Sequence, residues 1–67
     1  MAVTFRVALR RLRTERGVSR ARLARSTGYS ETHIAAIERG RRCNPTLAFV
    51  ETMADALGVD PFDMLRG

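Results

Sequence analysis

Residues 20–39, RARLARSTGYSETHIAAIER, predict two short helices joined by a tight turn. Ala24 offers a small side chain where two helices cross at a steep angle, and Gly28 tolerates the positive φ that such a turn requires. Ile34 and Ile37 lie three residues apart, so both point from the second helix toward the rest of the domain. These positions fit together at fixed spacing, and the stretch therefore decides the fold.

Two helices in this arrangement form a helix-turn-helix, whose second helix enters the major groove of DNA. The charge distribution points the same way. All twelve basic residues are Arg; residues 1–42 carry a net charge of +8, whereas residues 43–67 carry −3. A basic front half favours a polyanion as the partner of one face. A solvated arginine-rich surface is the open alternative.

The length of 67 residues predicts one domain over 1–67, which buries about 60% of its unfolded surface and gains from a dimer interface. No apolar run approaches the roughly 20 residues of a membrane span, and a signal peptide is not recognisable, so we expect a cytoplasmic protein. The single Cys43 and single His33 exclude an internal disulfide and a zinc site within one chain. We expect no cofactor, and Cys43 to be either a bystander in a loop or a redox-sensing thiol.

Capping signals divide the chain into five short helices and give the all-α class. The first has an apolar stripe of Phe5, Leu9 and Leu12. The expected helices cover 5–16, 20–26, 31–39, 47–57 and a short stretch from 61, with the caps Thr4, Ser19, Ser30, Thr46 and Asp60.

This organisation resembles the lambda repressor/Cro-like family, also called the xenobiotic response element family. The matching stretches are LRRLRTERGVS, LARSTGYS, IAAIERGRR, NPTL and ADALGVDPFDML. The length and the apolar tail look most like the stand-alone controller proteins of restriction–modification systems. The resemblance implies a compact bundle of five helices and a transcription regulator that represses or activates.

The resemblance also implies roles for individual residues. In this family Gln usually stands in place of Arg20, contacts a phosphate and braces the first recognition residue. Tyr29 replaces a small aliphatic residue, and either packs half-buried or turns its hydroxyl to the DNA backbone. Arg13 is expected to pair with Glu38 and so brace the recognition helix.

Bases are expected to be read by the outward face of the helix over 31–39, because Ile34 and Ile37 face inward. The resemblance places base contacts at Glu31, Thr32 and Ala36. Glu31 accepts a hydrogen bond from cytosine or, alternatively, serves the helix dipole or holds Arg20. The expected base-contacting residues are Glu31, Thr32, Ala35, Ala36 and Arg39.

Phosphates are expected to be held by basic side chains and by groups at the starts of helices. For His33 the alternative is a packed position without DNA contact. The expected phosphate-contacting residues are Arg10, Arg20, Ser30, His33, Arg41 and Arg42.

A two-fold homodimer is expected from the region 47–65. If Leu47, Val50, Ala54 and Leu57 face inward, Phe49 lies off that stripe and the tail adds further apolar surface. Alternatively, Phe62 and Leu65 fold back into the core. A symmetric pair sets two recognition helices about 34 Å apart and requires a palindromic site. The expected interface residues are Phe49, Met53, Phe62, Met64 and Leu65.

The sequence therefore predicts a sequence-specific regulator that binds double-stranded DNA. An enzyme is not expected, because no Ser/His/Asp set and no glycine-rich phosphate loop is present. The alternative from another class is a protein-binding module, such as an antitoxin or a regulator that contacts RNA polymerase, in which DNA binding is secondary.

Overall fold

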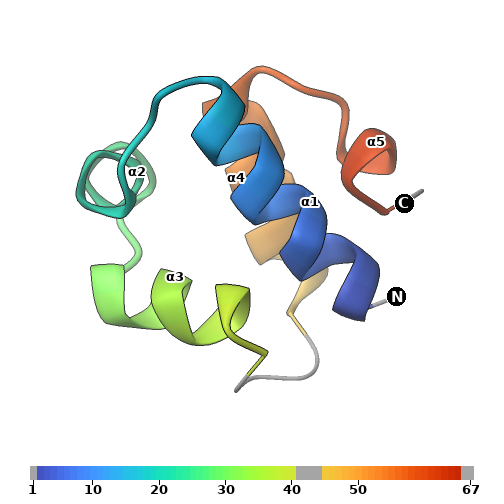
Figure 1. Ribbon diagram of the computed structural model, residues 1–67, viewed down its shortest axis with the longest axis horizontal. Coiled ribbons are helices and arrows are strands. Elements are labelled where there is room, and N and C mark those ends of the chain that lie inside the picture. Colours follow the sequence, from blue (N-terminus) through green and yellow to red (C-terminus); the bar gives the residue numbers. More distant parts are fainter. Residues whose placement is uncertain (1, 41–44, 66–67) are drawn as a thin grey trace.

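In the part of the chain that the structure describes, five α-helices follow one another (Figure 1), which confirms the predicted all-α class. The structure is a computed structural model that describes residues 2–40 and 45–65, with side chains over 5–40 and 45–65. Within these ranges there is no strand, and no helix is both long and apolar enough to cross a membrane. The helices are α1 (Ala2–Glu15), α2 (Arg20–Thr27), α3 (Glu31–Glu38), α4 (Leu47–Leu57) and α5 (Pro61–Leu65).

The helix boundaries follow the capping signals closely except at the first helix. Thr46 Oγ1 accepts a hydrogen bond from the Phe49 N–H at 3.1 Å, and Asp60 Oδ1 accepts one from the Phe62 N–H at 2.9 Å. However, α1 begins at Ala2, so Thr4 lies inside the helix and is not its N-cap. Residues 2–4 contain no Gly or Pro to stop the helix, and it continues past the expected start.

The end of α1 is fixed by a glycine. Gly17 has a φ of +67°, and the Val18 N–H donates to the Arg13 carbonyl at 3.0 Å, which closes the last turn. This reversal sends the chain toward α2 and brings Val18 back beside α1.

The packing separates the helix-turn-helix from the last helix (Figure 1). The helices α1 and α4 pack together in the middle of the fold, and α2 and α3 lie on one side of them. The helix α5 packs on α1 and α4 but contacts neither α2 nor α3. The two regions assigned to DNA and to a partner subunit are therefore distinct parts of the described structure.

Phe49 lies at the centre of the core, and the expectation that it is exposed is wrong. Its side chain is 2% exposed. Its ring centroid lies 6.0 Å from that of Phe5, 4.7 Å from that of Tyr29 and 5.2 Å from that of His33, in each case edge to face. These rings come from α1, the α2–α3 turn and α3, so Phe49 joins α4 to all three.

The rest of α4 and α5 corrects the expected dimer interface. Met53 and Met64 are fully buried in the monomer and cannot contact a partner; Leu65 is half-buried. Leu47, expected inside, is 66% exposed because the buried face of α4 is rotated toward Phe49 and Met53. Among the expected interface residues, Phe62 is the large apolar side chain that stays exposed, at 75%.

Candidate nucleic-acid interface

The helix-turn-helix is built by two serine caps and one glycine turn. Ser19 Oγ accepts from the Arg22 N–H at the start of α2, and Ser30 Oγ accepts from the His33 N–H at the start of α3, both at 3.0 Å. Gly28 has a φ of +83°, and its N–H donates to the Ala24 carbonyl at 2.9 Å. The predicted caps and turn glycine are thus confirmed.

One face of α3 is anchored and the other is open. Ile34 and Ile37 are buried as predicted, against a core that includes Leu23 of α2. The opposite face and Arg20 line one open concave surface, which we call the α3 groove. Its residues are Arg20, Glu31, Thr32, Ala35, Ala36 and Arg39.

The α3 groove brings together all five residues that the sequence assigned to base contact. Glu31, Thr32 and Arg39 are exposed, and Ala35 and Ala36 are half-buried. Because Ala35 and Ala36 have small side chains, no long side chain stands in the middle of the groove. This surface can therefore come close to the base edges that are exposed on the floor of a DNA groove.

Glu31 begins α3, where a carboxylate is stabilised by the positive end of the helix dipole. Within the described residues no ion pair joins it to Arg20, so the interpretation that it holds Arg20 is wrong. Arg20 is bound by a different carboxylate, that of Glu38.

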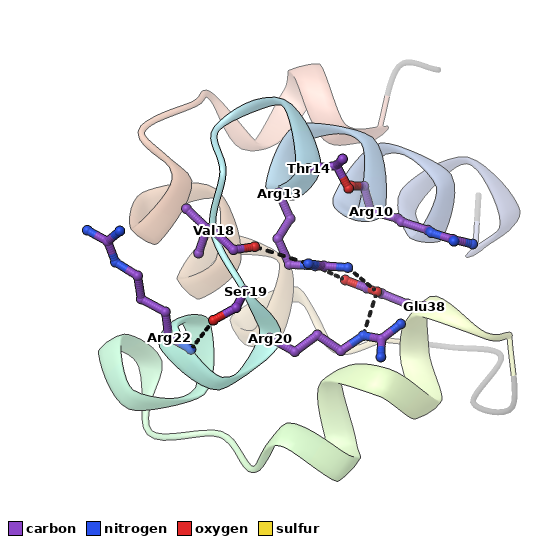
Figure 2. A network of polar contacts seen from close by, with 8 residues as sticks. All are labelled: Arg10, Arg13, Thr14, Val18, Ser19, Arg20, Arg22 and Glu38. Atoms are coloured by element: carbon purple, nitrogen blue, oxygen red, sulfur yellow. Dashed lines mark hydrogen bonds and ion pairs between the residues drawn. The ribbon is translucent and has the colours of Figure 1, made fainter.

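Glu38 forms a buried ionic network with two arginines, drawn in Figure 2. Arg13 Nε donates to Glu38 Oε2 at 2.7 Å, and Arg13 Nη2 donates to Oε1 at 3.1 Å. Arg20 Nε donates to the same Oε1 at 3.0 Å. The pairing of Arg13 with Glu38 that the resemblance implied is present, and the Arg20 contact is an addition that the sequence did not reveal.

The network joins three helices through one carboxylate. Arg13 comes from α1, Arg20 is the first residue of α2, and Glu38 is the last residue of α3. Arg13 Nη1 also donates to the Val18 carbonyl at 3.0 Å, which ties in the α1–α2 turn (Figure 2). Burial by itself raises the pKa of Glu38, but the hydrogen bonds and charges of Arg13 and Arg20 outweigh it and leave the pKa below its ordinary value.

His33 and Tyr29 are packed together on Phe49. Their ring centroids lie 5.4 Å apart with an interplanar angle of 18°, so the two rings are stacked. Both residues are half-buried, as the packing interpretation of each predicted. The aromatic stack holds the start of α3 against the core.

The remaining phosphate-contact candidates differ in what the structure shows of them. Arg10 is exposed on α1, in an open groove whose lining includes Glu38. Ser30 uses its hydroxyl oxygen as the α3 cap, which leaves the hydroxyl proton able to donate. Arg41, Arg42 and Cys43 lie outside the described residues.

No cluster of three or more His, Cys, Asp or Glu side chains suited to a metal ion occurs in the described part of the chain. The chemistry of the α3 groove is instead that of hydrogen bonding and charge. Two arginines and one carboxylate line it, together with the hydroxyl and methyl groups of one threonine and the methyl groups of two alanines.

Comparison with known proteins identifies relatives of this chain. The helix-turn-helix domain family matches residues 4–66. An uncharacterized helix-turn-helix-type transcriptional regulator of Sinorhizobium fredii is 36% identical over 55 residues, which are 82% of this chain and 70% of that protein. A hypothetical transcription factor of Neisseria meningitidis serogroup B is 40% identical over 57 residues, and the regulator SinR of Bacillus licheniformis is 30% identical over 58. The chain spans about half the length of these last two proteins, 53% and 52%.

A solved structure has the same fold. The crystal structure of the restriction-modification controller protein C.AhdI from Aeromonas hydrophila superposes with a TM-score of 0.86 at 35% sequence identity, over 94% of each chain. This agrees with the resemblance to controller proteins. The serine-capped helix-turn-helix, the open α3 groove and these relatives together show that the chain belongs to the family of helix-turn-helix transcriptional regulators.

Proposed function

We propose that this protein regulates transcription by binding a palindromic DNA operator as a homodimer, with α3 as the recognition helix. The observation that carries the proposal is the α3 groove, in which Arg20 and the outward side chains of α3 share one accessible surface. The groove belongs to a basic front half with a net charge of +8. A cytoplasmic location accompanies this function, since the operator is there.

Base recognition falls to the outward residues of α3. The Thr32 methyl group can contact a thymine methyl, and Ala35 and Ala36 let the base edges approach closely. Glu31 can accept from a cytosine amino group, and Arg39 can donate to a guanine. Together these side chains read one half-site.

Phosphate contacts orient the protein and supply most of the affinity. Arg10, Arg20, Ser30 and His33 fill this role, together with Arg41 and Arg42, which follow α3 in the sequence. Ser30 and His33 act where α3 presents its N-terminus to the backbone.

Dimerisation is assigned to the end of the molecule that carries α5. Phe62 is 75% exposed, and a symmetric partner that covers it removes apolar surface from water. Because α5 contacts neither α2 nor α3, a partner there leaves the α3 groove free. The acidic back half then faces away from DNA.

A toxin or a subunit of RNA polymerase is the alternative occupant of the same surface, and Phe62 is again the side chain that favours it. Sedimentation of the protein alone separates the two. A dimer at tens of micromolar supports self-association, whereas a monomer that is unchanged by operator DNA leaves the surface to another protein.

Selection from a pool of random duplexes tests the proposal. The selected sites should be inverted repeats with half-site centres about 10–10.5 base pairs apart. With about 6–10 phosphate contacts per dimer, affinity for them should fall by about 10³–10⁵ between 50 and 200 mM salt. Failure to enrich any sequence, or binding that does not respond to salt, would contradict it.

A further inference from the structure

The contacts of Glu38 are not fully explained by a role in bracing the fold. Its carboxylate is almost completely buried, at 1% side-chain exposure, and it serves two arginines at once. One negative and two positive charges leave this network with a net charge of +1. The excess charge is favourable only if an anion is near or if one arginine reaches water.

The two arginines differ in what they leave unused. Arg13 donates through Nε, Nη1 and Nη2, and its side chain is 14% exposed. Arg20 donates through Nε, its side chain is 29% exposed, and within the described residues its Nη groups have no hydrogen-bond partner. Every nitrogen of the Arg13 guanidinium therefore donates at least once, whereas both Nη groups of Arg20 are left without an acceptor in the described part of the chain.

The unused Nη groups belong to a side chain that lines the α3 groove, the surface assigned to DNA. A guanidinium held through Nε keeps its two Nη groups as a planar fork. Such a fork fits two acceptors side by side, which are the O6 and N7 of guanine or two oxygens of a phosphate.

We infer that Glu38 is a positioning residue for DNA binding, which fixes Arg20 through Nε so that its Nη fork meets a pair of acceptors on DNA. This inference rests on the proposed function and names the residue that organises one contact within it. Glu38 does not touch DNA. It acts through Arg20, and separately it braces α3 through Arg13.

A double-mutant cycle measured on DNA binding separates the two roles of Glu38. The proteins are the full chain, Glu38→Gln, Arg20→Gln and the double variant, each first shown to be folded by circular dichroism. Their affinities are measured by fluorescence anisotropy on the selected duplex and on a random duplex, from about 50 to 200 mM salt. Arg25→Gln is the matched control, because Arg25 is an exposed arginine on the same helix.

Arg20→Gln and Glu38→Gln should each weaken binding by about tenfold, and Glu38→Gln should cost clearly less in the Arg20→Gln background than in the original chain, since only its bracing through Arg13 is left to lose there. Equal losses from Glu38→Gln in both backgrounds would overturn the inference, because bracing the fold through Arg13 predicts that result. An Arg25→Gln loss as large as that of Arg20→Gln would also overturn it, since charge alone would then explain the effect.

Arg20→Lys keeps the inference testable if Glu38→Gln does not fold. Lysine preserves the charge but has neither the Nε–H nor the fork, so affinity should fall nearly as far as for Arg20→Gln. Affinity equal to that of the original protein would overturn the inference.

The same measurements identify the group on DNA that the two Nη groups of Arg20 contact. A loss that is equal on both duplexes, with a salt slope reduced by about 1, assigns the fork to a phosphate. A loss confined to the selected duplex, with one base position relaxed, assigns it to guanine. If the original chain binds no duplex, both the proposed function and this inference fail. If the chain binds DNA but the effects of Glu38→Gln and Arg20→Gln are simply additive, this inference alone fails.

Discussion

Replacing Phe49 by alanine should remove much of the stability of this domain. The Phe49 side chain is 2% exposed and meets three other aromatic rings within 6.0 Å. Truncating a buried Phe to Ala costs about 3–5 kcal/mol, and the lost edge-to-face contacts favour the upper part of that range. At about 0.05–0.15 kcal/mol per residue, the 67 residues have about 3–10 kcal/mol in total. We therefore expect Phe49→Ala to lose about 4 kcal/mol and to be largely unfolded if the original domain has no more than about 4 kcal/mol of stability.

Phe62→Ala is the matched control, because the same substitution is made where the side chain is 75% exposed. It should change the free energy of unfolding by no more than about 0.5 kcal/mol in the monomer. Urea denaturation followed by circular dichroism measures both variants, at two protein concentrations so that dissociation of a dimer is separated from unfolding. A loss below about 1 kcal/mol for Phe49→Ala, or equal losses for the two variants, would refute the assignment of Phe49 to the core.

Thr32→Ala should cost about 1–3 kcal/mol of binding at one base position and relax the preference there, and an unchanged set of selected sites would place base recognition on another face. Because the pKa of Glu38 is lower in the folded chain than in the unfolded one, its stabilisation is fully present above the ordinary value of 4.5 and is lost as the pH falls through the folded value. Urea midpoints between about pH 3 and pH 7 should show this loss, and Glu38→Gln should lack it; identical pH dependence in both proteins would contradict the network. Phe62→Glu should give folded monomers that bind half-sites weakly and without cooperativity, as sedimentation and binding curves would show, whereas an undiminished dimer would exclude Phe62 from the interface.

Local signals in the sequence predicted most of the helix boundaries. A serine or threonine cap, or a glycine with a positive φ, acts on the adjoining turn of backbone. The helix end that it sets can therefore be predicted without knowing which other helices pack against it. Ser19, Ser30 and Gly28 are examples at the helix-turn-helix. The spacing of Ile34 and Ile37 predicted that both face inward. The α3 groove lies on the opposite face of the same helix, so its position was predicted as well.

The buried face of α4 was predicted only in part: Val50, Ala54 and Leu57 are buried as expected, but Leu47 is exposed. The apolar residues of α4 include Leu47, Phe49, Val50 and Met53, which cover so much of the helix surface that their spacing does not fix its rotation. The rotation is decided by the rings that surround Phe49, which come from segments far away in the sequence. The expected set of interface residues is wrong in part for this reason, because Phe49 and Met53 are buried within the monomer.

The contact between Arg20 and Glu38 was missed for a related reason. Arg20 is followed on α2 by two further arginines that are exposed, and nothing local distinguishes it from them. Only the turn at Gly28 brings the first residue of α2 to the last residue of α3, 18 positions later. The sequence placed Arg20 at the interface but did not show what holds it there.

The most direct test of the central claim, that the outward face of α3 binds DNA, is a nuclear magnetic resonance titration of the protein with its selected duplex. The largest amide shifts should fall at Arg20 and across α3, while the amides of α5 should not change between the free and the bound dimer. Shifts concentrated in α5 and the acidic back half, with α3 unchanged, would contradict the claim.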